Sequence, residues 1–290
     1  MGDLTLTGDL LTVTVSTDGA EPTSLLADGR ELLWQAGPQW RRHAPVLFPV
    51  IGRVVEDEIV VRDATWPMGQ HGFARDSAFQ VVQGSADRAL LRLTDSERTR
   101  QHLPFPFTLD VDYAVEGSTL RTRYRISTDG PSALPFSIGS HPAFAWPLVE
   151  GVAKDAHAVV FEQAEPAPVR QVVQTLLTPD PVPTPVEGHV LRLRPELFAD
   201  DAIVMEHLAS RSLRYGAPGT PSIRLDLHGF EHLGVWSKPT GADFVCLEPW
   251  AGLPSPQGPQ HEYRDKPYQR LVRAGEVVEV GYDITVLPPA

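Results

Sequence analysis

The chain has 290 residues and a formal net charge of −12, which argues against the basic surface that binding to nucleic acid requires. The same charge disfavours an anionic membrane as partner, and no stretch of about 20 apolar residues predicts a membrane span. Cys246 is the only cysteine, which excludes an internal disulfide and a thiolate metal cluster. With no signal-peptide pattern at its start, we expect a cytoplasmic protein without a nucleic-acid or membrane partner.

Alternation of apolar and polar residues with a period of two predicts β-strands along most of the chain. In residues 107–126, Leu109, Val111 and Tyr113 alternate with polar residues, and a turn at residues 116–118 leads into a second alternating stretch. This segment predicts a hairpin with one solvent-exposed face. Similar patterns predict strands within residues 11–19, 89–96, 189–198, 222–230, 243–250 and 276–287.

Helical periodicity is scarce, and only residues 97–103 and 196–209 are candidates for short helices. The proline-rich residues 164–187 predict a long surface excursion. Many short strands between Gly and Pro turns predict a mainly β, antiparallel sandwich or barrel with few short helices. Because candidate functional residues fall on both sides of the excursion, we expect one domain over residues 1–290.

Three motifs place basic side chains beside apolar strands. The run "VLFPVIGRV" ends in Gly52 and Arg53, and "QHGFARD" gathers His71 and Arg75 around a glycine. The motif "SHPAF" sets His141 before a proline, which favours extended backbone and forbids a helix there. Taken singly, each also fits an ordinary surface ion pair, a turn or a core histidine.

A fourth motif, "FVCLEPW", places Phe244, Cys246 and Glu248 on one face of a strand and the intervening apolar residues on the other. A carboxyl group at such a position is desolvated, so its pKa is expected to rise unless a cation or hydrogen-bond donor opposes this. A structural Glu–Arg pair is the alternative interpretation. We interpret Cys246 as a small buried apolar residue.

Two metal hypotheses deserve comparison. The motif "HGFEH" at residues 228–232 matches the H-x-x-E-H pattern of certain zinc proteases, but that chemistry needs a helix, and Gly229 with its flanking strands disfavours one. The second hypothesis joins His43, His71, His141 and Glu248, and no His-x-His pair supports it. We therefore predict no metal and no cofactor.

The order of "PVLFPVIGR", "HGFARD", "SHPAFAWP" and "FVCLEPWAG" in a mainly β chain resembles the aldose 1-epimerase (galactose mutarotase) superfamily, and within it the LacX-like branch. The resemblance extends from about residue 4 to residue 287. It implies a large antiparallel β supersandwich whose cleft binds a small-molecule sugar. It also implies an isomerase of carbohydrate metabolism that needs no cofactor.

By the same resemblance, His141 is the general acid, Glu248 is the general base, and Arg53 and His71 hold sugar oxygens. Gly52 stands where the galactose enzymes carry Asn. Their aspartate that fixes sugar hydroxyls has no secure match here, and possible stand-ins are Asp226 and Asp243.

The residue types suit the chemistry that the resemblance implies. Anomer interconversion needs a base for the C1 hydroxyl proton and an acid for the ring oxygen, and a Glu/His pair supplies both. The aromatic residues Trp146, Trp236 and Trp250 are candidates for stacking on the pyranose.

Three functions remain open: a mutarotase for a free hexose, a mutarotase for a hexose 6-phosphate bound through Arg75, or a non-catalytic sugar-binding or sensor protein. The oligomeric state is expected to be monomer or homodimer.

Overall fold

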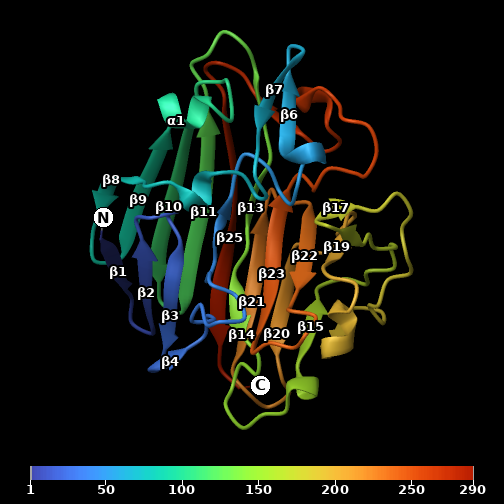
Figure 1. Ribbon diagram of the computed structural model, residues 1–290. Coiled ribbons are helices and arrows are strands. Elements are labelled where there is room, and N and C mark those ends of the chain that lie inside the picture. Colours follow the sequence, from blue (N-terminus) through green and yellow to red (C-terminus); the bar gives the residue numbers. More distant parts are fainter. Residues whose placement is uncertain (1, 290) are drawn as a thin grey trace.

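The structure is a computed structural model and describes residues 2–289. Its largest sheet has nine antiparallel strands (Figure 1). In spatial order they are β18 (Val190–Arg192), β15 (Ala158–Phe161), β20 (Ser212–Gly216), β21 (Ser222–His228), β25 (Val277–Leu287), β11 (Thr119–Ser127), β10 (Thr108–Glu116), β9 (Arg88–Thr94) and β8 (Gln80–Gly84).

A second sheet of six strands lies in front of the first in Figure 1 and carries the polar motifs. Its path is β19 (Ile203–Met205), β22 (His232–Trp236), β23 (Phe244–Ala251), β13 (Ile138–Ser140) and β5 (Val46–Leu47), with β14 (Ala143–Ala145) also paired to β23. A four-stranded sheet precedes both in sequence and consists of β1 (Asp3–Thr7), β2 (Leu11–Ser16), β3 (Pro22–Ala27) and β4 (Arg30–Glu31).

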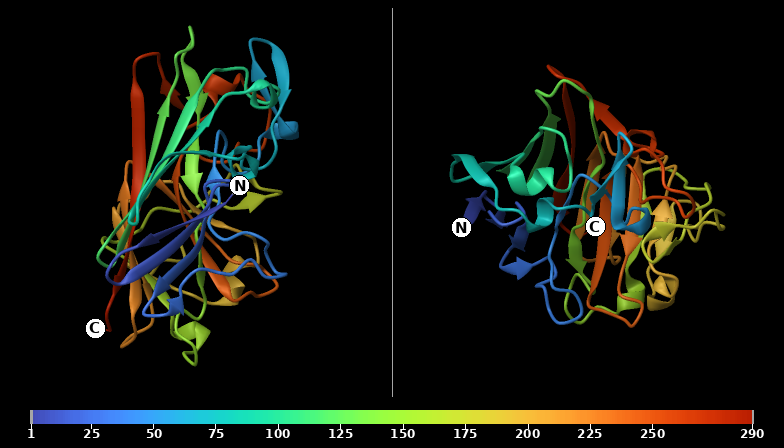
Figure 2. Two further views of the ribbon diagram at one scale, coloured as in Figure 1. Left: turned by 90° about the vertical axis from the view of Figure 1, so that its left-hand side faces the viewer. Right: turned by 45° about the horizontal axis from the view of Figure 1, so that its top comes forward.

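Short elements connect the sheets. Three pairs of strands are β6 (Glu58–Val61) with β7 (Ala64–Pro67), β12 (Leu134–Phe136) with β24 (Arg270–Val272), and β16 (Val172–Val173) with β17 (Leu176–Leu177). The β6–β7 hairpin projects from the large sheets in the left view of Figure 2. Helical turns are α1 (Glu97–Arg100) and the 3-10 turns η1 (Val55–Asp57), η2 (Ala74–Asp76), η3 (Lys154–Ala156), η4 (Pro195–Phe198) and η5 (Tyr263–Asp265).

The mainly β, antiparallel prediction is confirmed, and strands occur in every segment where alternation predicted them. The predicted helix at residues 196–209 is wrong beyond Phe198, because residues 203–205 form β19 and pair with β22. Of the proposed helix at residues 97–103, only α1 is α-helical. Within residues 2–289, no helix combines the length and apolarity needed to cross a membrane.

The main core lies between the two large sheets. From β23, Val245 and Leu247 point into it, while Tyr124 of β11 and Tyr282 of β25 belong to the same buried cluster. The opposite face of β23 carries Cys246 and Glu248, so one strand separates the core from the candidate site. This is the two-face arrangement that the alternation in "FVCLEPW" predicts.

Candidate active site

Glu248 lies in the middle of β23, opposite Gly234 of β22. A Cβ atom at Gly234 would come within 2.5 Å of the Trp250 ring, and a Cβ atom at Gly139 of β13 within 2.7 Å. The indole of Trp250 therefore packs over two glycines, one on each neighbouring strand. This packing leaves Glu248 and Trp250 together on the wall of a cavity.

His141 lies between β13 and β14, outside any helix, as the Pro142 that comes next predicts. Its ring is stacked on the indole of Trp40, with ring centroids 4.8 Å apart. The Nε2 atom of His141 lies 3.2 Å from Oε2 of Glu248, and the two side chains are 9% and 2% exposed. The sequence motifs thus bring an imidazole and a carboxyl group together out of bulk water.

Burial dominates the electrostatics of this pair. It is the largest cause that lowers the pKa of His141 to about 3, and the positive charges of Arg75 and Arg42 contribute to this decrease. It also raises the pKa of Glu248 well above its usual range, and the negative charge of Asp201 adds to that increase. Within residues 2–289, neither His141 Nδ1 nor Glu248 Oε2 has a regular hydrogen-bond partner. The imidazole and the carboxyl group therefore keep hydrogen-bonding capacity that the described part of the chain does not use.

His71 lies beside this pair, with its ring centroid 5.6 Å from that of His141. Its backbone has a φ of +63°, and its N–H donates to the carbonyl of Gly52 over 2.7 Å. In return, Gly52 N–H donates to Nδ1 of His71 over 3.1 Å. Because Nδ1 accepts this hydrogen bond, the proton of the neutral ring sits on Nε2, which can donate to a ligand. Burial holds the pKa of His71 well below its usual value.

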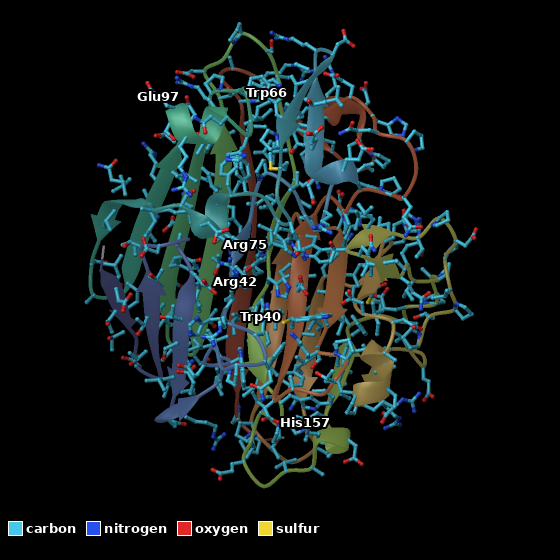
Figure 3. The ribbon with its side chains drawn as sticks, viewed as in Figure 1. Trp40, Arg42, Trp66, Arg75, Glu97 and His157 are labelled. Atoms are coloured by element: carbon cyan, nitrogen blue, oxygen red, sulfur yellow. The ribbon has the colours of Figure 1, made fainter. Side chains whose placement is uncertain are left out.

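Arg42 and Arg75 add two guanidinium groups to the same cavity. Arg75 donates from Nη2 to the carbonyl of Gln70 over 2.6 Å, and Arg42 donates from Nη2 to Oδ1 of Asp76 over 2.8 Å. Figure 3 shows Arg75, Arg42 and Trp40 one below another near the centre of the molecule. The sequence predicted a role for Arg75 and missed Arg42 and Trp40.

Asp201 is the acidic residue that sequence reasoning missed. It lines the cavity together with Glu248 and Trp236. Burial raises the pKa of Asp201, while hydrogen bonds from the Trp236 side chain and from the backbone of Ala202 oppose the increase. The earlier candidates lie elsewhere: Asp226 pairs with Arg224, and Asp243 pairs with Lys154 over 2.7 Å.

These side chains enclose a cavity of about 350 Å³, within the range of sites for small molecules. Part of its wall comes from the β16–β17 hairpin of the proline-rich excursion, which is therefore more than a surface loop. The lining residues are Trp40, Arg42, Gly52, Gln70, His71, Arg75, His141, Val172, Thr175, Asp201, Ala202, Trp236, Glu248, Trp250 and Pro254.

Two residues expected at the site are absent from this lining. The side chain of Arg53 turns to Asp57, with Nε 3.0 Å from Oδ1, because this carboxylate four residues later offers a nearer partner. Trp146 is a core residue, 1% exposed, whose indole N–H donates to the carbonyl of Lys154. Trp146 is therefore not a stacking face, whereas Trp236 and Trp250 do line the cavity, and the role of Arg53 in binding sugar stays a prediction.

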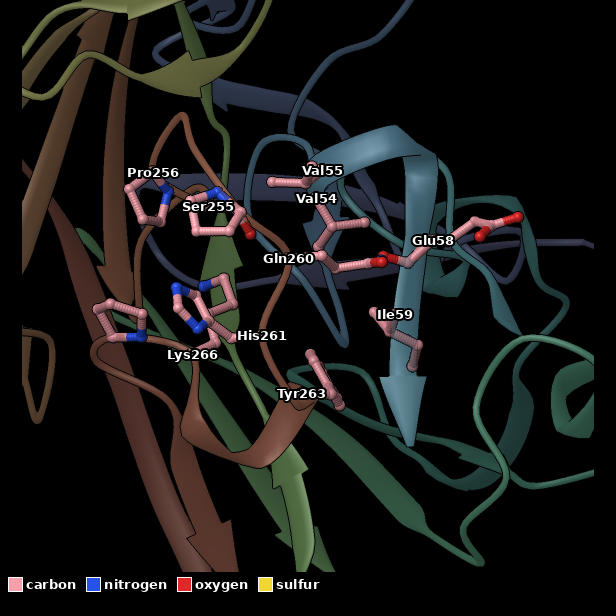
Figure 4. A pocket seen from close by; sticks show the side chains of 12 residues that line it. Val54, Val55, Glu58, Ile59, Ser255, Pro256, Gln260, His261, Tyr263 and Lys266 are labelled. Carbon is pink, nitrogen blue, oxygen red and sulfur yellow. The ribbon is translucent and has the colours of Figure 1, made fainter. Parts of the chain in front are cut away.

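A smaller pocket lies between β6 and residues 255–267 (Figure 4). Its free volume of about 30 Å³ holds on the order of a single water molecule. Lys266 forms part of its wall and donates a hydrogen bond to the carbonyl of Leu253. A sugar ring fits the larger cavity and not this one.

Donor atoms that suit a metal are also present. His141, Cys246 and Glu248 each offer a ligand atom, and these atoms lie within 4.8 Å of one another. Metal binding requires the thiolate, however, and burial raises the pKa of the Cys246 thiol well above its usual value. In the "HGFEH" motif, His228 ends a strand and pairs with Asp283, so the helix of a zinc protease does not form.

Comparisons with known proteins agree with this fold. Residues 3–266 match the family model for aldose 1-epimerase. Protein LacX, in its plasmid form from Lactococcus lactis subsp. lactis, is 31% identical over 295 residues, which span 97% of this chain and 98% of the relative.

Two solved structures share the whole architecture. The galactose mutarotase related enzyme from Lactobacillus acidophilus superimposes with a TM-score of 0.91 at 27% identity, over 100% of this chain and 98% of that one. A galactose mutarotase-like protein from Lactobacillus casei ATCC 334 gives the same TM-score and identity over 99% and 100%. The chain belongs to the aldose 1-epimerase family, in its LacX-like branch.

Proposed function

We propose that the protein is a cofactor-independent aldose 1-epimerase that interconverts the α and β anomers of a hexose. The observation that carries this proposal is the pair formed by Glu248 and His141, 3.2 Å apart on the wall of a cavity large enough for a monosaccharide. Family membership supports a sugar epimerase or mutarotase. We also propose that the chain works in the cytoplasm.

In the proposed reaction, the carboxylate of Glu248 accepts the proton of the C1 hydroxyl while the imidazolium of His141 gives a proton to the ring oxygen. The bond between C1 and the ring oxygen breaks, and C1 becomes an aldehyde carbon. After rotation about the C1–C2 bond, the hydroxyl on C5 attacks the other face of the aldehyde. His141 takes back its proton and Glu248 returns the other, so nothing is consumed.

Throughout the reaction, Glu248 and His141 together carry one proton, which is on His141 before ring opening and on Glu248 after it. Burial favours the neutral form of the pair, a protonated carboxyl beside a neutral imidazole, because charges are poorly solvated there. This neutral form is also the state that the pair reaches after ring opening. Hydrogen bonds from the sugar hydroxyls stabilise the ionic form, which starts the reaction.

The other cavity residues hold the sugar in this proposal. Nε2–H of His71 donates to a sugar oxygen, and the carboxylate of Asp201 accepts from sugar hydroxyls. Trp40, Trp236 and Trp250 offer aromatic faces to the pyranose. Asp201 replaces the two aspartates considered from the sequence.

The test is the optical rotation of freshly dissolved α-D-glucose or α-D-galactose at neutral pH and low buffer concentration. We expect acceleration that falls by about 100-fold or more in Glu248→Gln and in His141→Gln, the usual contribution of general acid–base catalysis. The control is Glu279→Gln, which changes a surface carboxylate paired with Arg125 and is expected to leave the rate unchanged.

Two results would contradict the proposal. One is full activity in a folded Glu248→Gln variant. The other is calorimetric binding of sugar without any acceleration of exchange of neutral or phosphorylated hexoses, which would favour the non-catalytic sugar-binding function.

A further inference from the structure

Two positively charged side chains on the cavity wall share one carboxylate. Arg42 contacts Oδ1 of Asp76 at 2.8 Å, whereas Nε of Arg75 is 3.7 Å from Oδ2 of the same residue. The side chain of Asp76 is 51% exposed and that of Arg75 is 16% exposed. The counter-charge is therefore on the solvent side, and the guanidinium of Arg75 is the more buried partner.

Arg75 has donor capacity that the protein does not use. Its Nη2 donates to Gln70, but its buried Nε has no hydrogen-bond partner within the described residues 2–289. Burial and the nearby positive charge of Arg42 together lower the pKa of Arg75 to about 10, although Asp76 and Glu21 oppose the decrease. Two like charges held together in a partly dry site are unfavourable, and an anion that accepts hydrogen bonds from both would offset this.

We propose that the sugar carries an anionic group on C6, a phosphate ester or a carboxylate, and that Arg42 and Arg75 bind it. This inference rests on the proposed function of the same cavity. Guanidinium groups suit either anion, because their planar N–H forks match the oxygen spacing of carboxylates and phosphates.

The chemistry of the sugar ring places this group on the arginine side. In the proposed reaction His141 contacts the ring oxygen, and that oxygen is bonded to C5, which carries C6. Both arginines line the same cavity as His141 and His71 and act electrostatically on these two histidines, so we place C6 toward them.

The anomeric end has the opposite environment. Glu248 and Asp201 interact electrostatically with each other, so an anionic group is repelled from that end. The charge distribution of the cavity therefore orients a sugar with one anionic end. An anion on the arginines also offsets the positive charge that disfavours protonated His141.

The experiment compares kcat/KM for anomer exchange of D-glucose, D-glucose 6-phosphate and D-glucuronate, measured by NMR at low ionic strength with the spontaneous rate subtracted. We expect kcat/KM to be about tenfold or more higher for a charged sugar, mainly through a lower KM, as for a charge-assisted hydrogen bond. The charged sugar with the larger gain identifies the anion. The preference is expected to shrink at high salt.

The variant is Arg42→Gln, chosen because Arg42 is the less buried arginine and its removal is less disruptive to folding. We expect it to lower kcat/KM much more for the charged sugar than for glucose. Arg192→Gln is the matched control, since it removes an exposed arginine that faces Glu187 at 3.8 Å. It is expected to change neither value.

The outcomes separate this inference from the proposed function. Equal kcat/KM for neutral and charged sugars, with exchange still dependent on Glu248, would overturn the anion site alone. If exchange is accelerated for no sugar, the proposed function fails. In that case calorimetry with inorganic phosphate still tests the anion site, and equal affinity in wild type and Arg42→Gln overturns it.

Discussion

The environment of single residues decides the charge state of the site. Glu248 and His141 are both buried, and burial acts in opposite directions on an acid and a base, so the neutral form of each is favoured. For His71, a hydrogen bond from Gly52 also selects the tautomer. The alternation in the sequence predicted the burial of Glu248. It could not predict the tautomer, which depends on a backbone N–H from another segment.

The residues missed from the sequence have one property in common. Trp40, Arg42 and Asp201 lie in irregular segments, and only the packing of distant strands brings them to the cavity. The side chain of Arg53 lies outside the cavity lining for a local reason, because Asp57 is close enough in the chain to contact its guanidinium. Motif order therefore predicted the proximity of His141 and Glu248 better than it predicted the walls of the cavity.

Lys266 is an ionisable residue outside the proposed chemistry. It is 7% exposed, and burial lowers the pKa of its amine to about 7. Below that pH, both the folded and the unfolded chain carry the charge. Between about pH 7 and the unfolded value of about 10.4, only the unfolded chain binds the proton, so folding becomes more favourable as the pH rises.

We predict that the free energy of unfolding of the wild type rises relative to Lys266→Met as the pH increases from about 7 to about 10. Each pKa unit corresponds to about 1.4 kcal/mol, so the gain is on the order of a few kcal/mol. Urea denaturation at a series of pH values measures it. Lys238→Met serves as the control, and a difference between wild type and Lys266→Met that stays flat over this range would refute the prediction.

At the scale of elements, period-two alternation was a good guide because most strands have one face in the core. It predicted the hairpin of β10 and β11 with its turn, and the two faces of β23. It failed at residues 203–205, where β19 is buried on all three residues and the sequence shows no alternation. Burial on both faces removes the signal that distinguishes a short strand from a helix.

The packing of β22 against Trp250 gives a prediction at this scale. In Gly234→Ala the added Cβ atom meets the indole ring at 2.5 Å, so β22 or Trp250 must move. We expect the free energy of unfolding to fall by about 1–3 kcal/mol, the usual cost of overpacking. Urea denaturation checks this, with Gly69→Ala as control because a Cβ atom there meets no atom within 4 Å. Equal stability of the two variants would contradict the proposed role of Gly234.

At the scale of the whole molecule, one buried cluster includes Leu6 near the start of the chain and Ile284 near its end. Because this core draws on the two large sheets and on the four-stranded sheet, it supports the proposal that residues 1–290 form a single domain. We predict that tryptophan fluorescence and far-UV circular dichroism report one coincident transition on thermal or urea unfolding. Two separated transitions would show two independent units.

Backbone hydrogen bonds hold the β16–β17 hairpin against neighbouring segments. The carbonyl of Thr175 accepts from Arg53 N–H over 3.1 Å, and Leu177 N–H donates to the carbonyl of Ser255 over 2.9 Å. Main-chain bonds of this kind constrain the identity of the side chains very little. In evolutionary terms, the residues of this hairpin can diverge to suit different sugars while the strand that carries Glu248 stays the same, so selectivity and chemistry can change separately.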